Sequence, residues 1–450
     1  MRGPWPAPLL GTAWRVLARG VPTLHQQNLQ DRCLFGDIFA GTYWGTQLAV
    51  AACPHFFRRV FITHWKEYDR SRLEKECFSE LLGQGLILVD NAEWGEMRRL
   101  YQPAFSDGNM LAFGGLVKQW TTEFADTLLA QSRSERAIDI QSAMVQFAFR
   151  LIGMFALGVD FEDRARYAAE YAQMSSADIG CSNFGELWGM LLERTQDRLP
   201  FGRLQWWKLV KTRGVRSFER AHKLLLDLVD RIIEERSNGH NQVDKPVEFQ
   251  DLLSLILCEK GRRYSRTEAR HQVLTFLFAG HDTTTSLVSW CLWLLAARPE
   301  HLARAQAEAD AHASGGGGRP FLRSCLLETL RLYPSVPARG RSLEATGDEF
   351  AVPAPERCPM LQRRGGRLPL ARGTAVVLAV NAVHRHPGYW ERPDAFEPSR
   401  FEDHLRSSAA SPLFSAPRPS EKDDALTYLP FGAGPRRCIG ERLALLEAEE

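Results

Sequence analysis

The chain of 450 residues is long enough for several domains, although single enzymes of this size also occur, so length does not fix the domain count. Its composition, 44% hydrophobic and 24% charged, is that of a packed globular protein. The formal net charge is only +2 and the basic residues are spread along the chain, which argues against nucleic acid as a partner.

The nine cysteines are odd in number, form no CxxC pair and lie far apart. Such usage indicates free thiols in a reducing compartment, not a disulfide framework or a zinc site. We therefore expect an intracellular protein, in which most of the cysteines serve as small apolar residues.

Residues 1–30 form a proline-containing N-terminal segment with no acidic residue before Asp31. Prolines at positions 4, 6 and 8 interrupt its apolar runs, so we expect neither a signal peptide nor a membrane anchor there, and a weak transit peptide stays open. The longest apolar region, 273–297, is broken by a polar run from His281 to Thr285, which favours a helix buried in protein. The chain is thus expected to hold no transmembrane segment and to be soluble or associated with a membrane surface.

The elements follow in chain order. Residues 35–61 are rich in β-branched and aromatic residues with glycines between them, and predict a short hairpin followed by a helix. Beyond Trp94, apolar residues recur at three- and four-residue spacing, and the long helix after Ser265 opens with a capping box and stops at Pro299. Two short strand-like patches, 335–352 and 373–381, predict a minor sheet. The glycine run at 313–320 and the polar stretch at 406–424 read as loops.

This pattern predicts a mainly α fold with a minor β region, in one domain that spans residues 31–450. We find no internal repeat that would favour a repeat architecture.

Cys438 stands in the stretch PFGAGPRRCIGERLALLE, just before a predicted helix. A helix N-terminus and the neighbouring Arg436 and Arg437 favour the thiolate, and the glycines let a bulky planar group approach the backbone. Three interpretations compete: a nucleophilic thiol, a thiolate that binds a metal, and a structural turn. No cysteine-protease signature surrounds Cys438, and a single thiolate cannot complete a zinc site, but it can be the fifth ligand of a haem iron.

The same loop resembles the haem-binding loop of the cytochrome P450 family, position for position, at six residues: Phe431, Gly432, Gly434, Arg436, Cys438 and Gly440. The similarity extends along nearly the whole chain. It implies a cytochrome P450-like single domain, haem b as the cofactor, Cys438 as the axial ligand of the iron, and cofactor contacts from Phe431 and Gly432.

A second match is AGHDTT, residues 279–284, inside the long helix. Glycine in a helix interior costs about 1 kcal/mol relative to alanine, so Gly280 is an unexpected choice for a helix that only packs. In the family this helix crosses the oxygen-binding face of the haem, and Asp282 and Thr283 resemble the pair that delivers protons during catalysis. The competing interpretation is a core helix that turns its polar residues to solvent.

A third match is ETLR, in which Glu328 and Arg331 lie three residues apart and share one helix face. Leucines crowd the same helix, so we expect the pair to be partly buried and to need further hydrogen bonds. Arg400, in FEPSRF, resembles the residue that completes a structural Glu–Arg–Arg network in the family. A surface ion pair is the alternative.

The last match concerns the propionates of the haem. Trp94 and Arg98, in WGEMR, resemble the family's pair that holds one propionate. Arg341 follows LYPSVP where the family places another partner, with Arg339 as a close competitor, and Arg436 is the third candidate.

The resemblance implies a haem-dependent monooxygenase that inserts one atom of O₂ into an apolar organic substrate. Because the sequence has no flavin or iron–sulfur motif, electrons are expected from a separate reductase or ferredoxin. The chain ends soon after Cys438, where the family continues, so we expect the C-terminal part to be missing. A haem-binding remnant without turnover is therefore the alternative, and a helical scaffold without cofactor is a third. The start MRGPWPAP resembles the hinge that follows a membrane anchor, which leaves peripheral membrane contact open, and the substrate stays undetermined.

Overall fold

The computed structural model describes residues 24–43, 46–134, 137–198, 201, 205–238, 249–258, 264–315, 318–351, 366–402 and 426–450. Most of the proline-containing segment and the whole loop predicted at 406–424 lie outside these residues. Two compact units can be distinguished and are described in turn. The first comprises Met1–Cys77, Asp197–Gln205 and Trp290–Cys438, and the second Phe78–Gln196, Trp206–Ser289 and Ile439–Glu450.

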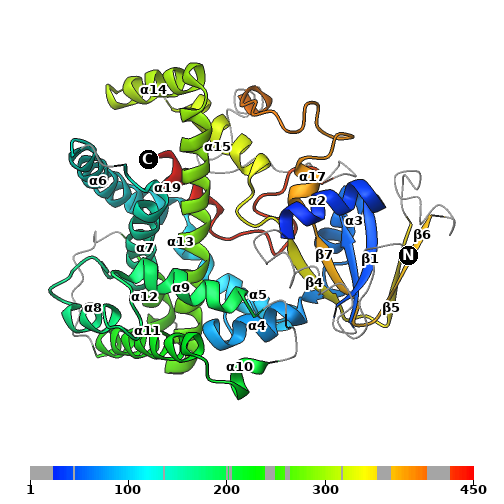
Figure 1. The fold of residues 1–450 in the computed structure, drawn as a ribbon, viewed down its shortest axis with the longest axis horizontal. Coiled ribbons are helices and arrows are strands. Elements are labelled where there is room, and N and C mark those ends of the chain that lie inside the picture. Colours follow the sequence, from blue (N-terminus) through cyan, green and yellow to red (C-terminus); the bar gives the residue numbers. More distant parts are fainter. Residues whose placement is uncertain are drawn as a thin grey trace. The chain divides into compact units, whose positions relative to one another are not determined.

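The first unit contains the β region, with a five-stranded sheet in the order β1-β2-β7-β4-β3 (Figure 1). The hairpin β1/β2 is antiparallel, β2 pairs with β7 in parallel, and β7 and β3 each pair with β4 in antiparallel fashion. A separate antiparallel pair joins β5 to β6. The strands are β1 (Ile38–Tyr43), β2 (Thr46–Ala51), β3 (Tyr68–Arg70), β4 (Arg339–Leu343), β5 (Gly347–Ala351), β6 (Arg367–Ala371) and β7 (Ala375–Leu378).

The longer helices that lie wholly in the first unit are α2, α14 and α15. Pro54, Pro299 and Pro320 open α3, α14 and α15, where the missing N–H costs no hydrogen bond. Side chains of the sheet and of α3 form one apolar core, with Phe56 and Phe57 fully buried. The bounds are α2 (Leu24–Phe35), α3 (Pro54–Arg58), the π-helix η2 (Arg59–Thr63), α4 (Arg72–Leu82, in this unit as far as Cys77), α14 (Pro299–Ala313), α15 (Pro320–Leu332) and α17 (Val380–His384).

Among the described residues of the second unit, all regular secondary structure is helical. Its helices are α5 (Asn91–Tyr101), the 3₁₀ turn η3 (Gln102–Phe105), α6 (Asp107–Ser132), α7 (Ile140–Leu157), α8 (Ala168–Met174), α9 (Phe184–Gln196), α10 (Trp206–Leu209), α11 (Arg213–Ser237), α12 (Leu252–Cys258), α13 (Arg266–Ala296, in this unit as far as Ser289) and α19 (Glu441–Glu449).

The prediction of a mainly α fold with a minor β region is confirmed. The hairpin and following helix lie where the sequence placed them, whereas β3 and β6 lie outside the predicted strand regions. The capping box of α13 is formed: the Glu268 backbone N–H donates to Ser265 Oγ at 3.2 Å, and the Ser265 N–H donates to Glu268 Oε2 at 2.8 Å.

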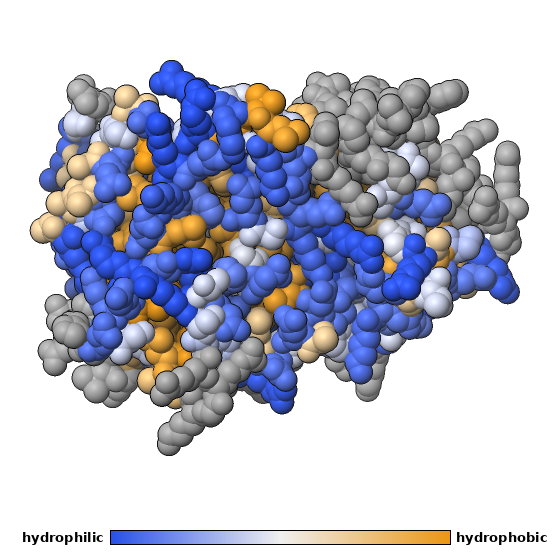
Figure 2. Space-filling view, turned by 90° about the horizontal axis from the view of Figure 1, so that it is seen from below, coloured by the Kyte–Doolittle hydropathy of each residue, from blue (hydrophilic) through white to orange (hydrophobic). Residues whose placement is uncertain are grey.

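Burial and surface polarity agree with a packed globular chain. One described helix, α7, is long and apolar enough to cross a bilayer, but 61% of that window is buried inside the structure, as in a core helix. Hydrophilic side chains cover most of the face shown in Figure 2, with apolar side chains exposed between them.

The eight described cysteines are free thiols, and Cys33 and Cys258 are exposed, so these two are not core residues.

Candidate active site

Cys438 lies in a loop that folds back on itself. Its backbone N–H donates to the Phe431 carbonyl at 2.9 Å, and the Arg437 N–H donates to the Gly434 carbonyl at 3.0 Å. The Cys438 side chain is exposed, whereas Phe431 and Gly432 are buried. The loop therefore presents the thiol on a backbone that its own hydrogen bonds fix.

Two glycines give the loop its shape, because both have left-handed backbone conformations, with φ of +76° at Gly432 and +67° at Gly434. A Cβ added to Gly434 would lie 1.9 Å from the Phe61 carbonyl oxygen. One added to Gly432 would meet the guanidinium carbon of Arg339 at 3.4 Å. Because Gly434 has no side chain, the loop can lie directly against the Phe61 carbonyl of η2. Gly432 lies next to Arg339 of β4.

Three arginines gather near this loop. Arg339 and Arg341 are two residues apart on β4 and so point to the same face of the sheet. Burial lowers the pKa of both, and that of Arg341, which is 4% exposed, lies well below its usual value. Arg436 adds to this positive charge, and its guanidinium lies 3.6 Å from Asp69.

One guanidinium N–H of Arg339 makes no hydrogen bond within the described residues. Arg339 donates to the Pro430 carbonyl at 3.2 Å, but its Nε is buried without a partner among the described residues. Arg341 donates to the Gly340 carbonyl at 2.8 Å and stacks over Phe61. Buried cations with a donor left over fit an anionic partner, such as the propionate of a haem. The residues present therefore fit the predicted cofactor.

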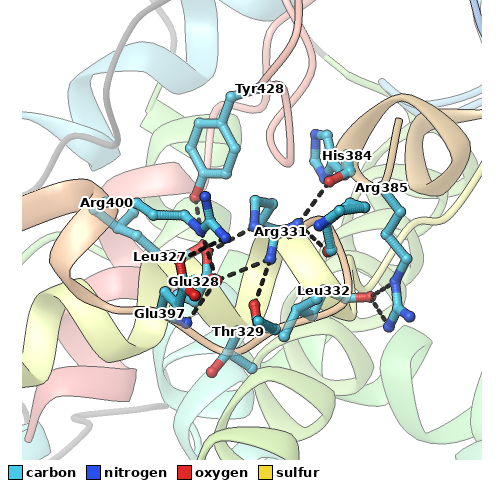
Figure 3. A network of polar contacts seen from close by, with 12 residues as sticks. Leu327, Glu328, Thr329, Arg331, Leu332, His384, Arg385, Glu397, Arg400 and Tyr428 are labelled. Atoms are coloured by element: carbon cyan, nitrogen blue, oxygen red, sulfur yellow. Dashed lines mark hydrogen bonds and ion pairs between the residues drawn. The ribbon is translucent and has the colours of Figure 1, made fainter. Parts of the chain in front are cut away.

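The Glu328–Arg331 pair is fully buried and bidentate (Figure 3), with Nε to Oε2 at 2.7 Å and Nη2 to Oε1 at 2.8 Å. Arg331 also donates to the backbone carbonyls of His384, Pro393 and Ala395. A buried ion pair is tolerable only when such additional bonds satisfy both charges. The alternative of a surface ion pair is wrong.

Arg400 joins the same network. Its Nε lies 3.4 Å from Glu328 Oε1, and the backbone N–H of Glu397 donates to that oxygen at 2.9 Å. Arg400 also donates to the carbonyls of Glu391 and Arg392. The network thereby ties α15 to the segment that contains Glu397 and Arg400 (Figure 3).

His384 connects this network to the chain that leads into the cysteine loop. The Leu429 N–H donates to His384 Nε2 at 2.9 Å, and Tyr428 donates to the Leu327 carbonyl at 2.9 Å. Burial, followed by the charge of Arg331, lowers the pKa of His384 to about 3. The imidazole is therefore neutral and able to accept. Nothing in the sequence around His384 distinguished it beforehand.

In the second unit, α13 carries the proposed proton-delivery pair. Thr283 is half-buried and donates to the Ala279 carbonyl at 2.9 Å, whereas Asp282 is exposed. Thr285 donates to the His281 carbonyl at 2.8 Å and lies 3.3 Å from the Met144 carbonyl of α7. The side chains of Asp282 and Thr283 follow each other in the helix and leave it in different directions.

Gly280 has a packing role, contrary to the expectation from sequence. A Cβ there would lie 2.3 Å from Ile152 Cδ1 of α7, so the glycine permits a close helix crossing. The residue is therefore no independent indication of chemistry on α13.

Trp94 and Arg98 lie one turn apart on α5, and both are half-buried. These two residues belong with Asp282 and Thr283 to the second unit. The first unit holds Cys438, the arginine cluster and the Glu328 network.

Comparisons with known proteins identify the family to which the chain belongs. The family model described as Cytochrome P450 matches residues 1–449. Cytochrome P450 97B2, chloroplastic, of Glycine max is 26% identical, with 92% of this chain and 74% of that protein covered. Cytochrome P450 4A7 of Oryctolagus cuniculus is 26% identical over 90% of this chain and 74% of its own length.

A solved structure supports the fold. The crystal structure of the cytochrome P450DA heme domain superposes with a TM-score of 0.72 at 24% identity, covering 99% of this chain and 88% of that one. With a family match over nearly its whole length, the chain belongs to the cytochrome P450 family, whose members are haem-dependent oxidoreductases.

Proposed function

We propose that this protein is a monooxygenase that inserts one atom of O₂ into an apolar organic substrate, with electrons from a separate reductase or ferredoxin. The observation that carries the proposal is the exposed thiol of Cys438 near the buried Arg339, whose Nε donor has no partner among the described residues. Together these groups suit a thiolate ligand for iron and partners for carboxylates.

We propose the roles in holding haem that the resemblance to the cytochrome P450 family implies. Cys438 would ligate the iron, and Phe431 and Gly432 would line the cofactor with the loop backbone. Arg341 and Arg436 would bind propionate oxygens. For Trp94 and Arg98 on α5, the resemblance implies a propionate contact as well. Arg339, whose guanidinium lies next to Gly432, is the competing propionate partner in the first unit.

The Glu328, Arg331 and Arg400 network takes no part in the chemistry under this proposal. It fixes the backbone around His384 and Leu429, and so the start of the cysteine loop.

Haem, when bound, supplies the iron at which O₂ is reduced. Two electrons and two protons convert O₂ and a C–H bond into an alcohol and one water molecule. Thr283 holds a hydroxyl on α13 for this proton delivery, with the exposed Asp282 as its proposed partner. If the protons arrive without oxygen transfer, the same two electrons release hydrogen peroxide instead.

We also propose an intracellular protein, soluble or bound to a membrane surface. The alternative, a haem-binding protein without turnover, makes a different prediction: stable haem uptake with no product under a competent reductase.

The first test is the carbon monoxide difference spectrum of the reduced protein, because electron donation from a thiolate gives a distinctive Soret shift. We expect the shifted band in the wild type and its loss in Cys438→Ser. Cys258→Ser, which changes another exposed free cysteine, should keep the band. A haem protein whose spectrum is the same in Cys438→Ser would overturn the ligand assignment.

Turnover is tested with a redox partner and a small panel of apolar probes: a long-chain alkane, a fatty acid and a monoterpene. Oxygenated product in excess of enzyme supports the monooxygenase. Haem binding without any product supports the alternative.

A further inference from the structure

Glu74 is an acidic residue beside the arginines near the cysteine loop, and the proposed mechanism assigns it no role. It lies in the first turn of α4, and its Oε1 accepts the backbone N–H of Gly340 at 3.0 Å. Gly340 stands on β4 between Arg339 and Arg341. A Cβ at Gly340 would lie 2.5 Å from the same carboxylate oxygen, so this contact requires a glycine at that position.

This contact is not the one that the local sequence favours. Ser71 and Glu74 have the three-residue spacing of a capping box, in which the glutamate accepts the backbone N–H of the serine. In the capping box of α13, Glu268 does accept from the Ser265 N–H, at 2.8 Å. In α4 the Glu74 N–H donates to Ser71 Oγ at 3.4 Å, but the carboxylate extends to β4 instead. The Glu74 side chain therefore supports the strand and not the start of its own helix.

The arginines around Gly340 need a negative charge. Arg70 of β3 stands directly opposite Arg341 of β4 in the antiparallel register, and like charges in such pairs destabilise a sheet. Burial lowers the pKa of Arg339 and of Arg341, the neighbouring Arg70 lowers both further, and Glu74 raises both. The Oε2 of Glu74 lies 3.7 Å from Nη1 of Arg70. One carboxylate thus acts on three arginines of two neighbouring strands.

Two other acids lie near β3 and β4, and each has a cation of its own. Asp69 lies 3.6 Å from the guanidinium of Arg436. Glu344, the residue after β4, accepts from the exposed Arg72 at 3.0 Å. Glu74 is the acid that contacts β4 between its two arginines.

The same guanidinium groups are the proposed partners of the haem propionates. A propionate that joins Arg339 or Arg341 brings a second negative charge close to Glu74, and the two anions repel each other. Glu74 should therefore stabilise the arginines most when no propionate contacts them, and less once haem is bound. By linkage, an anion that favours the haem-free protein lowers the affinity of the protein for haem.

We propose that Glu74 is a positioning residue and the built-in counter-ion of the cofactor site: it holds Arg339 and Arg341 in place on β4, and its charge opposes that of the propionates, so it sets how tightly the protein retains haem. The inference rests on the function proposed above, because it takes these arginines as propionate partners. Removing only the charge of Glu74 should therefore make the protein retain haem longer.

The test follows the transfer of haem from the purified holoprotein to an excess of apomyoglobin, which reports how fast haem leaves. Glu74→Gln keeps a carbonyl oxygen for the Gly340 N–H but loses the charge, and should release haem about 3- to 10-fold more slowly than the wild type. Glu74→Asp keeps the charge and should release haem at least as fast as the wild type. Glu349→Gln, which removes the charge of an exposed acid paired with Arg367, should match the wild type.

A second cofactor separates the effect of charge from that of structure. Iron protoporphyrin IX dimethyl ester has the haem plane without the propionate charges, so the wild type and Glu74→Gln should release it at the same rate. If Glu74 were merely structural, its replacement would speed the loss of haem and of the ester alike, and that result would overturn the inference. A Glu74→Gln protein that retains haem no longer than the wild type, or that carries none while Glu74→Asp is loaded, would overturn it as well.

This measurement needs no turnover, so the two proposals can fail separately. Slower haem release from Glu74→Gln, with no product from the wild type under a competent reductase, would support the counter-ion role and contradict the monooxygenase. Unchanged haem release in a protein that makes product would do the reverse. A wild type that takes up no haem would contradict both.

Discussion

At the scale of single residues, two features shape the cysteine loop: the missing side chain of Gly434, and the buried charges of Arg339 and Arg341. Gly434 has no Cβ, and this alone lets its backbone lie against the Phe61 carbonyl. Arg339 and Arg341 are charged and buried, a costly combination unless an anion joins them. Both features prepare the loop for a planar, anionic cofactor.

We predict that Gly434→Ala lowers haem content severely. The change combines a left-handed backbone, which costs about 1–2 kcal/mol for a residue with a Cβ, with a clash against the Phe61 carbonyl. Gly373→Ala is the matched control, since Gly373 has φ of +82° but nothing within 4 Å of the added Cβ. Purified haem per protein is the readout. Equal losses in the two variants would show that backbone strain alone, not the close approach, is responsible.

Thr283→Ala should uncouple the reaction. Oxygen consumption should continue, while peroxide release rises and product falls by about 10-fold or more, because a positioned hydroxyl for proton delivery is lost. Thr283→Ser keeps the hydroxyl and should retain most of the coupling. Product formation per electron that is unchanged in Thr283→Ala would exclude the proposed role.

The sequence identified some of these residues, left others undecided and missed one. The loop pattern around Cys438 singled out the residue, and the family resemblance implied its role as an iron ligand, which stays a prediction. The sequence could not decide between Arg339 and Arg341, because both lie on one face of β4 and both are involved in the cluster. The buried acid Glu447 of α19 was missed, although an acid on the same helix face as Leu443 and Leu446 was a usable signal.

At the scale of elements, α15 shows that two residues close together on one helix can owe their structural role to contacts with segments far away in the sequence. The three-residue spacing of Glu328 and Arg331 predicted a shared face, but their burial depends on carbonyls more than fifty residues away in sequence. Arg400 was found from its own motif, whereas His384 was not, because its role comes only from its contacts with Leu429 and Arg331. Sequence periodicity describes one element and does not reveal such partners.

Removing one member of this network should therefore cost far more than removing a surface ion pair. Glu328→Ala leaves the Arg331 charge buried and unpaired, which typically costs about 3–5 kcal/mol, so we expect little or no folded, haem-loaded protein. Glu349→Ala breaks the exposed pair with Arg367 and should cost about 0–1 kcal/mol. Denaturation midpoints and haem content measure both. A well-folded, haem-loaded Glu328→Ala protein would refute the structural role.

At the scale of the whole molecule, helical periodicity correctly predicted the fold class, and glycine and β-branched residues marked the hairpin. The grouping of the chain into two units could not be predicted, because each unit combines segments that are far apart in sequence. Such long-range association depends on packing between elements, which no single sequence pattern encodes.

Two buried groups, one from each unit, should shape the pH dependence of stability. The pKa of His384 is about 3 in the fold against 6.5 ordinarily, so the unfolded chain takes up its proton first and stability is lost as pH falls below 6.5. The pKa of Glu447 is about 8 against 4.5, so the unfolded chain releases its proton first and stability is lost as pH rises above 4.5 toward 8. Each group contributes a slope of about 1.4 kcal/mol per pH unit in its window.

Between pH 4.5 and 6.5 the two slopes oppose each other, so for these groups stability should be nearly flat there and decline from 6.5 to 8. Glu447→Gln removes the alkaline decline and should shift the most stable pH upward. Thermal midpoints from about pH 4 to 9 for the wild type and the variant test this, with Asp126→Asn, which changes an exposed acid of α6, as the control. A decline between pH 6.5 and 8 that persists in Glu447→Gln would mean that another group, and not Glu447, binds the proton lost in that range.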